Sequence, residues 1–114
     1  MHLYHEISAD DLLNLMAQAP FLLIDVRDES ALADGMIAGA SHVPLAFIPV
    51  QYQSFNAVGN IIFYCQRGVR SAHAAAYVAS KGIQNVFTLV GGINAWQDAG
   101  QALAYISEER KHAI

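Results

Sequence analysis

The only cysteine of this 114-residue chain, Cys65, stands between a hydrophobic run and a line of alanines in the stretch IIFYCQRGVRSAHAAAYVAS. A thiol becomes a nucleophile when its pKa is lowered, and cationic side chains and a helix N-terminus both lower it. Two arginines follow the cysteine closely, and the alanine-rich stretch after them is typical of a helix. The spacing therefore predicts an activated thiolate at Cys65.

The residues after the cysteine form a candidate anion-binding loop, which comprises Gln66, Arg67, Gly68, Val69 and Arg70. A glycine gives the backbone the freedom to turn successive N–H groups inward. We expect Arg70, which adjoins the helix start, to bind an anion, whereas Arg67 could equally be an ordinary surface charge. Ser71 could form a hydrogen bond with Cys65 or cap the helix, and we expect the cap.

An inert role for the cysteine is the main alternative, because many lone cysteines are small buried hydrophobic residues. The polar and cationic neighbours of Cys65 favour the reactive interpretation, since reactive thiols lie in electropositive surroundings.

The charge balance argues against some classes of partner. Six Lys and Arg against ten Asp and Glu give a formal net charge of -4, which disfavours nucleic acid and anionic membranes as partners. Because two of the six basic residues follow the cysteine, the sequence predicts a local anion site on an acidic protein. The five scattered histidines and the cysteine show no metal-ligand spacing, so we expect no metal.

The composition, 54% hydrophobic and 14% charged, predicts one domain over residues 1–114, in which 104–114 form a polar tail or a terminal helix. The opening MHLYHEISADD lacks the basic region and apolar run of a secretory signal. The most apolar window, MIAGASHVPLAFIPV, is too short to span a bilayer. Since a single cysteine allows no intramolecular disulfide, we expect a soluble protein of the reducing cytoplasm.

Short apolar runs and helical stripes alternate along the chain. FLLIDV, NIIFYC and NVFTLV are typical of strands buried on both faces of a parallel sheet, and LYHEI is expected to add a strand. Ser8 and Asp11 approximate a capping box for a helix that ends before Pro20. A second helix carries Ala72, Ala75, Ala76 and Ala79 on one side and ends near Gly82, and a third carries Ile93 and Trp96 and ends near Gly100.

This alternation predicts an α/β domain with a mainly parallel sheet. Cys65 then lies at the C-terminal end of a buried strand, where open α/β sheets bind their ligands. The free N–H groups and the positive dipole of the next helix favour an anion at that point.

Two long segments, LLIDVRDESALADGMIAGASHVPL and IIFYCQRGVRSAHAAAYVASKGIQNVFTLVGGINAWQDAG, carry a family resemblance. The first is similar to a strand ending in Asp-x-Arg, a short helix, then Gly-His-Ile-x-Gly-Ala and a proline. The second is similar to a cysteine loop, a helix, a strand and a Gly-Gly-x-x-x-Trp helix. Together they resemble the single-domain form of the rhodanese family of sulfurtransferases, which implies a five-stranded, mainly parallel sheet with helices on both faces.

The resemblance implies a sulfurtransferase that needs no metal or organic cofactor. The Cys65 thiolate would take the outer sulfur of a sulfane donor such as thiosulfate, release sulfite, and hold a persulfide until a thiol or cyanide takes the sulfur. Asp25 and Arg27 match Asp-x-Arg, and a structural ion pair is at least as expected as a catalytic role. Because thiolate attack removes no proton, we expect His42 and His73 to be structural or surface residues.

The chain departs from the family pattern at two points: Met36 stands where histidine is usual, and QALAY instead of Leu-Pro follows Gly100. Phosphatases and arsenate reductases of the same fold are one alternative, but their motif is C-x5-R, and here Arg70 is the fifth residue after Cys65 and Ser71 the sixth. A sulfur-carrying or regulatory module that acts on a protein partner is another alternative.

Overall fold

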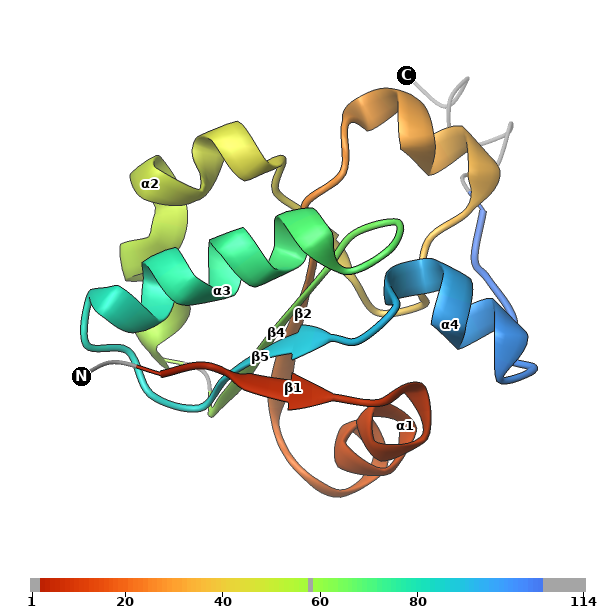
Figure 1. The fold of residues 1–114 in the computed structure, drawn as a ribbon, viewed down its shortest axis with the longest axis horizontal. Helices are drawn as coiled ribbons and strands as arrows, with labels where there is room; N and C mark the ends of the chain where they lie inside the picture. The colour runs from red at the N-terminus through yellow and green to blue at the C-terminus, as the bar shows by residue number, and fades with distance from the viewer. Residues whose placement is uncertain (1–2, 58, 106–114) are drawn as a thin grey trace, which may run out of the picture.

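The computed structural model describes residues 3–57 and 59–105 and contains one five-stranded parallel sheet, as the sequence predicts (Figure 1). The strand order is β1-β5-β4-β2-β3. The strands are β1 (His5–Ile7), β2 (Phe21–Asp25), β3 (Ser41–His42), β4 (Asn60–Tyr64) and β5 (Val86–Leu89). Four of them lie within the four apolar runs that the sequence analysis assigns to strands. The α/β fold class is therefore confirmed.

Helices cover both faces of this sheet. They are α1 (Ala9–Gln18), α2 (Ile48–Gln51), α3 (Val69–Ser80) and α4 (Gly92–Asp98), and short 3-10 helices span Glu29–Asp34, Leu45–Phe47 and Tyr52–Ala57. Helices α2 and α3 pack on one face of the sheet, and α1 and α4 pack on the other (Figure 1). The hydrophobic core therefore consists of two layers, one between each pair of helices and the sheet.

The period-two alternation of β4 divides its side chains between these layers. Ile61, Phe63 and Cys65 belong to the α3 side, whereas Ile62 and Tyr64 belong to the side of α1 and α4. Strand β4 is central, and both of its faces are covered, which explains its continuous apolar run. The alternation that divides the core side chains between the two faces therefore also places Cys65 on the face covered by α3.

Local signals place the helix ends correctly. The Ser8 side chain accepts a hydrogen bond from the Asp11 amide at 3.1 Å, so the predicted N-cap of α1 is confirmed. Gly82 follows α3 with a positive φ of 87°, as a C-terminal glycine does. Trp96 is 4% exposed and lies in the core beside Ile93.

Between β2 and β4, the sequence analysis expected only the short helix that the family resemblance implies, which is the 3-10 helix Glu29–Asp34, and it missed the other elements. Strand β3 has only two residues, Ser41 and His42, and pairs with Ile24 and Asp25. Two residues are too few to show the alternating pattern from which a strand can be predicted. The following segment forms a short helix in spite of Pro49, because a proline in the first helical turn has no N–H group to leave unpaired.

The two departures from the family pattern lie beside each other. Met36 and Ala104 exchange two backbone hydrogen bonds, at 2.8 and 2.7 Å, in an antiparallel bridge. A Cβ atom at Gly35 would meet Leu103 and Tyr105. The turn at Met36 and the segment after Gly100 are thus one local structure. Of the polar tail expected over 104–114, residues 106–114 lie outside the described residues.

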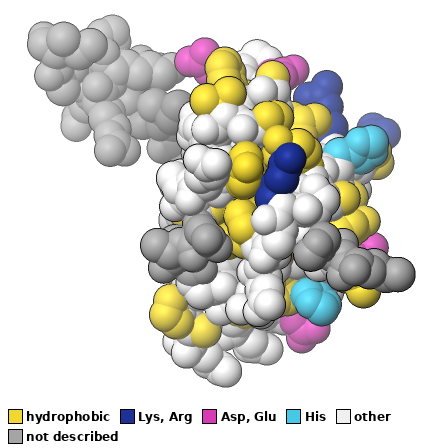
Figure 2. Space-filling view, turned by 90° about the vertical axis from the view of Figure 1, so that its left-hand side faces the viewer, with side chains coloured by type: hydrophobic (Ala, Val, Ile, Leu, Met, Phe, Trp, Pro, Cys, Tyr) yellow, Lys and Arg dark blue, Asp and Glu magenta, His cyan; other side chains and the backbone are white. Residues whose placement is uncertain are grey.

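Among the described residues, no helix is long and apolar enough to cross a membrane. Figure 2 shows one face of the molecule, on which hydrophobic side chains form several groups with polar side chains between them. Scattered surface groups of this kind are ordinary in proteins.

Candidate active site

Cys65 follows the last residue of β4 and is 3% exposed. Its loop runs over residues 66–68 into α3, which begins at Val69. Gly68 is the N-cap of this helix and has a φ of 98°, a left-handed conformation that favours glycine. The loop thereby turns back over the sulfur, and the amides of Gly68 and Ser71 face it.

Three hydrogen bonds of the loop and helix converge on the Cys65 sulfur. The Gly68 amide lies 3.1 Å and the Ser71 amide 3.4 Å from Sγ, and both donate to it. The Ser71 hydroxyl also lies 3.4 Å from Sγ. Donors around a sulfur favour its anionic form.

These donors decide the pKa of the thiol. Burial raises the pKa of Cys65, but the hydrogen bonds from the Ser71 hydroxyl and from the amides of Ser71, Gly68 and Arg67 outweigh it and lower the pKa below the ordinary value. The direction agrees with the sequence analysis. The causes that lower the pKa are hydrogen bonds, however, and the arginine charges are not among them.

Ser71 does not cap α3, so that expectation is wrong. The N-cap is Gly68, and the Ser71 side chain, which is fully buried, points to Cys65 and to Thr88. The third residue of a helix can face the sheet, which the sequence pattern of a cap does not take into account.

The start of α4 forms backbone hydrogen bonds with the cysteine loop. The amides of Ile93 and Asn94 donate to the carbonyl oxygens of Cys65 and Gln66, at 2.9 and 3.2 Å. A Cβ atom on Gly92, whose φ is 63°, would meet the backbone of both loop residues. The Gly-Gly pair at the start of α4 therefore allows a close backbone approach that no other residue permits.

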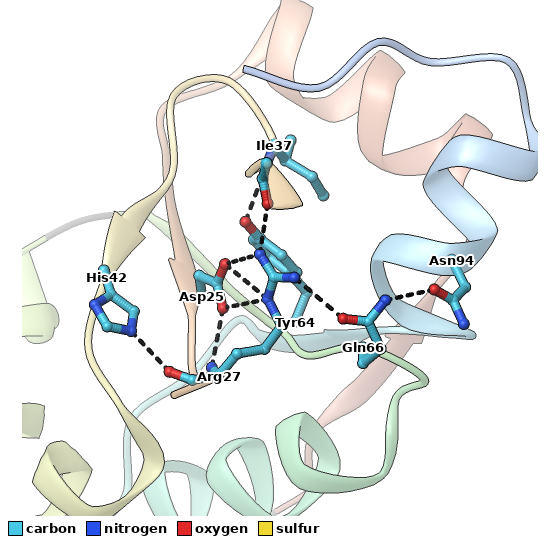
Figure 3. Close-up of polar contacts among 8 residues, drawn as sticks. Asp25, Arg27, Ile37, His42, Tyr64, Gln66 and Asn94 are labelled. Atoms are coloured by element: carbon cyan, nitrogen blue, oxygen red, sulfur yellow. Dashed lines mark hydrogen bonds and ion pairs between the residues drawn. The ribbon is translucent and has the colours of Figure 1, made fainter. Parts of the chain in front are cut away.

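Asp25 and Arg27 form a buried ion pair at the end of β2 (Figure 3). Arg27 Nη2 lies 2.7 Å from Asp25 Oδ2 and also donates to the Gly35 carbonyl at 2.7 Å. Its Nε lies 3.0 Å from Asp25 Oδ1. Burial lowers the pKa of Arg27, but the hydrogen bonds and the charge of Asp25 raise it by more than burial lowers it. The pKa is therefore raised overall, and the guanidinium remains charged.

Gln66 connects this ion pair to the cysteine loop and to α4. Its Oε1 accepts from Arg27 Nη1 at 3.1 Å, and its Nε2 donates to Asn94 Oδ1 at 2.6 Å (Figure 3). The sequence analysis assigned Gln66 to substrate binding. In the structure its side-chain amide joins the loop to Arg27 and to α4, and Gln66 also lines the hollow beside the sulfur.

The surrounding aromatic and histidine side chains have structural contacts. The Tyr64 hydroxyl accepts from the Ile37 amide at 3.1 Å, and burial raises its pKa. His42 Nε2 lies 2.7 Å from the Arg27 carbonyl oxygen. His73 is exposed and lines a separate hollow along α3. Among the described residues, no group of His, Cys, Asp or Glu could hold a metal ion.

A hollow of about 200 Å³ opens above the sulfur, and it is lined by Arg27, Cys65, Gln66, Arg67, Val69 and Arg70. Arg70 lies 3.6 Å from Asp28, but both side chains are more than half exposed, at 56% and 74%. Such a surface pair is weak and can release its arginine to a ligand. The hollow therefore combines a shielded sulfur with cationic side chains at its rim.

The sequence analysis missed Thr88 and Asn94. Thr88 lies in an apolar strand pattern and Asn94 in a short helix, and neither type nor spacing marks them. Their roles arise from contacts that join β5 to α3 and α4 to the cysteine loop.

Comparison with known proteins gives one consistent family. A family model described as the Rhodanese-like domain matches residues 8–99. A sulfurtransferase from Allochromatium vinosum is 34% identical over 97 residues, which cover 84% of this chain and 91% of that protein. The thiosulfate sulfurtransferase GlpE from Coxiella burnetii is 25% identical over 95 residues, which cover 83% of this chain and 89% of that protein.

Solved structures agree in fold. A rhodanese-like domain protein from Staphylococcus aureus superposes with a TM-score of 0.78 and 34% identity, covering 90% of this chain and 99% of that one. A protein of unknown function from Rhodopseudomonas palustris, described as a possible tyrosine phosphatase, gives a TM-score of 0.80 and 26% identity, covering 89% and 85%.

Proposed function

Because the chain belongs to the rhodanese-like domain family and is related to sulfurtransferases, we propose that it transfers sulfane sulfur from thiosulfate through a persulfide on Cys65. One observation carries the proposal. The Cys65 sulfur accepts hydrogen bonds from the Gly68 and Ser71 amides at the floor of a hollow rimmed by arginines. The name of the Coxiella burnetii relative supports thiosulfate as the donor.

In the first step the Cys65 thiolate attacks the outer sulfur of thiosulfate. A bond forms between Sγ and that sulfur, the S–S bond of thiosulfate breaks, and its electron pair leaves with sulfite. The enzyme then holds a persulfide anion. Arg70 and Arg67 stabilise the oxyanion that arrives and departs, and the loop amides stabilise the charge near the sulfur.

In the second step a thiophilic acceptor attacks the terminal sulfur. Cyanide leaves as thiocyanate, and an acceptor thiolate leaves as a persulfide anion. In both cases the electron pair of the breaking bond returns to Sγ as thiolate. No residue must remove a proton from Cys65, which is consistent with the structural contacts of His42. The acceptor could also be a protein thiol.

A reducing cytoplasm suits this chemistry, because the chain has only one cysteine and the reaction consumes a thiol acceptor. A sulfur-carrying module on a protein partner remains the main alternative. Such a module would form the persulfide but show little turnover with small acceptors.

A phosphatase activity is the second candidate, favoured by the description of the Rhodopseudomonas palustris structure. The phosphatase motif places arginine at the sixth position after cysteine. In this chain the sixth residue is Ser71, which is fully buried against Thr88. Its loop is therefore one residue too short for that motif, and turnover of an aryl phosphate is expected to be absent.

The test is the mass of the intact protein after incubation with thiosulfate. We expect the mass to increase by one sulfur atom and to return to its original value when cyanide or a thiol is added. Thiocyanate should appear with multiple turnovers. An unchanged mass with every sulfane donor would reject the proposal, and a mass increase without turnover would favour the carrier module.

Arg70→Ala should reduce kcat/KM with thiosulfate about tenfold, because the lost hydrogen bond joins two charged groups at an exposed rim. With a persulfide donor, which carries less negative charge than thiosulfate, kcat/KM should fall much less. Arg67→Ala is the matched control and should show the same trend more weakly. Equal losses for Arg70→Ala on both donors would contradict an anion-binding role.

A further inference from the structure

Two hydroxyl side chains are buried next to Cys65, in a layer that is otherwise apolar. Ser71 on α3 is fully buried, and Thr88 on β5 is 2% exposed. Their oxygens lie 2.7 Å apart, and Ser71 Oγ lies 3.4 Å from Cys65 Sγ. The sulfur and the two hydroxyls therefore form a continuous hydrogen-bonded chain that ends at Thr88.

Packing gives no reason for these hydroxyls. The rest of the layer between α3 and the sheet includes Ala75, Val78 and Val86. Alanine and valine would occupy nearly the same space at positions 71 and 88, and replacing both members of a buried polar pair by apolar groups is nearly neutral or stabilising. The pair therefore suggests a role that involves the sulfur.

The number of hydroxyl protons available decides in which direction the hydrogen bonds between Thr88, Ser71 and Cys65 are donated. Among residues 3–57 and 59–105, the Thr88 hydroxyl has no hydrogen-bond partner other than Ser71. A buried hydroxyl that donates to nothing is costly, so Thr88 is best satisfied when it donates to Ser71. Ser71 then directs its own proton to Sγ, and this bond is strongest when the sulfur is an anion.

We propose that Thr88 is a positioning residue for Cys65, because its hydroxyl fixes the Ser71 hydroxyl in the orientation that donates to the sulfur. Among the described residues, Thr88 forms no hydrogen bond with Cys65 and does not line the substrate hollow, so its hydroxyl acts through Ser71. The inference rests on Cys65 being the reactive residue of the proposed function. Its test requires no sulfur transfer.

The experiment measures iodoacetamide labelling of Cys65 against pH. A lowered thiol pKa means that the labelling rate reaches half of its plateau at a lower pH than for a free thiol. Thr88→Val removes the hydroxyl and keeps the shape, and it should raise the midpoint by about half a pH unit. Ser71→Ala should raise it by about one unit. At a pH well below both midpoints, the Thr88→Val rate should then be about threefold lower than that of the wild type.

Two further variants separate the hydroxyl from packing. Thr88→Ser keeps the hydroxyl without the methyl group, and its midpoint should match the wild type. The double variant Ser71→Ala/Thr88→Val should have the midpoint of Ser71→Ala alone, because Thr88 acts only through Ser71. If Thr88→Val destabilises the fold, Thr88→Ala serves as a second variant without the hydroxyl.

Other charged groups near the sulfur do not confuse the comparison. Arg27, Arg67 and Arg70 line the same hollow and are unchanged in every variant. His42 contacts the Arg27 carbonyl oxygen and is also the same in every variant. A midpoint for Thr88→Val and Thr88→Ala equal to that of the wild type would overturn the inference, as would a shift of Thr88→Ser equal to that of Thr88→Val. A shift of the midpoint in a protein that transfers no sulfur would leave the inference standing and reject only the proposed function.

Discussion

Cys65→Ser is expected to reduce the rate of sulfur transfer by more than about a thousandfold, because no other group in the hollow can replace the thiolate as the nucleophile. Serine keeps the size and the hydrogen-bonding capacity of the side chain. Its hydroxyl is not ionised near neutral pH, so it cannot attack a sulfane sulfur as a thiolate does. The protein mass after incubation with thiosulfate should remain unchanged.

Folding must be intact for this result to have meaning. Cys65 is buried, and Sγ accepts from two backbone amides that a serine oxygen can also satisfy. We expect the free energy of unfolding to change by no more than about 1 kcal/mol. Urea denaturation of the variant and wild type provides this control. Sulfur that remains bound to folded Cys65→Ser would place the acceptor elsewhere and contradict the mechanism.

The position of the reactive thiol could be predicted because local rules determine it. An apolar run ends at Cys65, a glycine and two arginines follow, and the alanine stripe requires a helix beside the sheet. The strand, the loop and the helix start then follow from periodicity and parallel topology. The observed ends of β4 and α3 differ little from the expected ones.

The partners of the thiol could not be predicted in this way. Thr88 meets Ser71 only because β5 lies beside β4 and α3 crosses over both, so a contact between residues 17 apart depends on the tertiary fold. The serine pattern alone favoured a cap, and the pattern of two arginines favoured charge as the cause of a low thiol pKa. In the structure, Gly68 is the N-cap of α3, and hydrogen bonds to the sulfur lower the pKa of the thiol.

The described polar side chains that are buried share one location. They are Asp25, Arg27, Ser71 and Thr88. The ion pair supports the cysteine loop through Gln66, and the hydroxyl pair contacts the sulfur itself. Burial of polar groups is costly unless they are paired, so their gathering around one loop is consistent with a site whose geometry must be precise.

Arg27→Met should lower the free energy of unfolding by about 3–5 kcal/mol, which is a large part of the stability of a small domain. The substitution leaves the fully buried Asp25 carboxylate without its cation. It also removes the donors to the Gly35 carbonyl and to Gln66, so the turn before Met36 and the cysteine loop lose their common support. Urea denaturation measures the loss.

Two matched variants test whether the buried charge causes this loss. Arg67→Met removes an exposed arginine from the same site and should change stability by no more than about 0.5 kcal/mol. Asp25→Leu/Arg27→Met removes both charges, and it should be more stable than Arg27→Met, since no carboxylate then remains unpaired in the core. Because the Asp25 side chain also accepts from the Arg27 backbone amide at 2.9 Å, the recovery should be incomplete. A double variant no more stable than Arg27→Met would show that the lost hydrogen bonds to Gly35 and Gln66, and not the unpaired charge, cause the destabilisation.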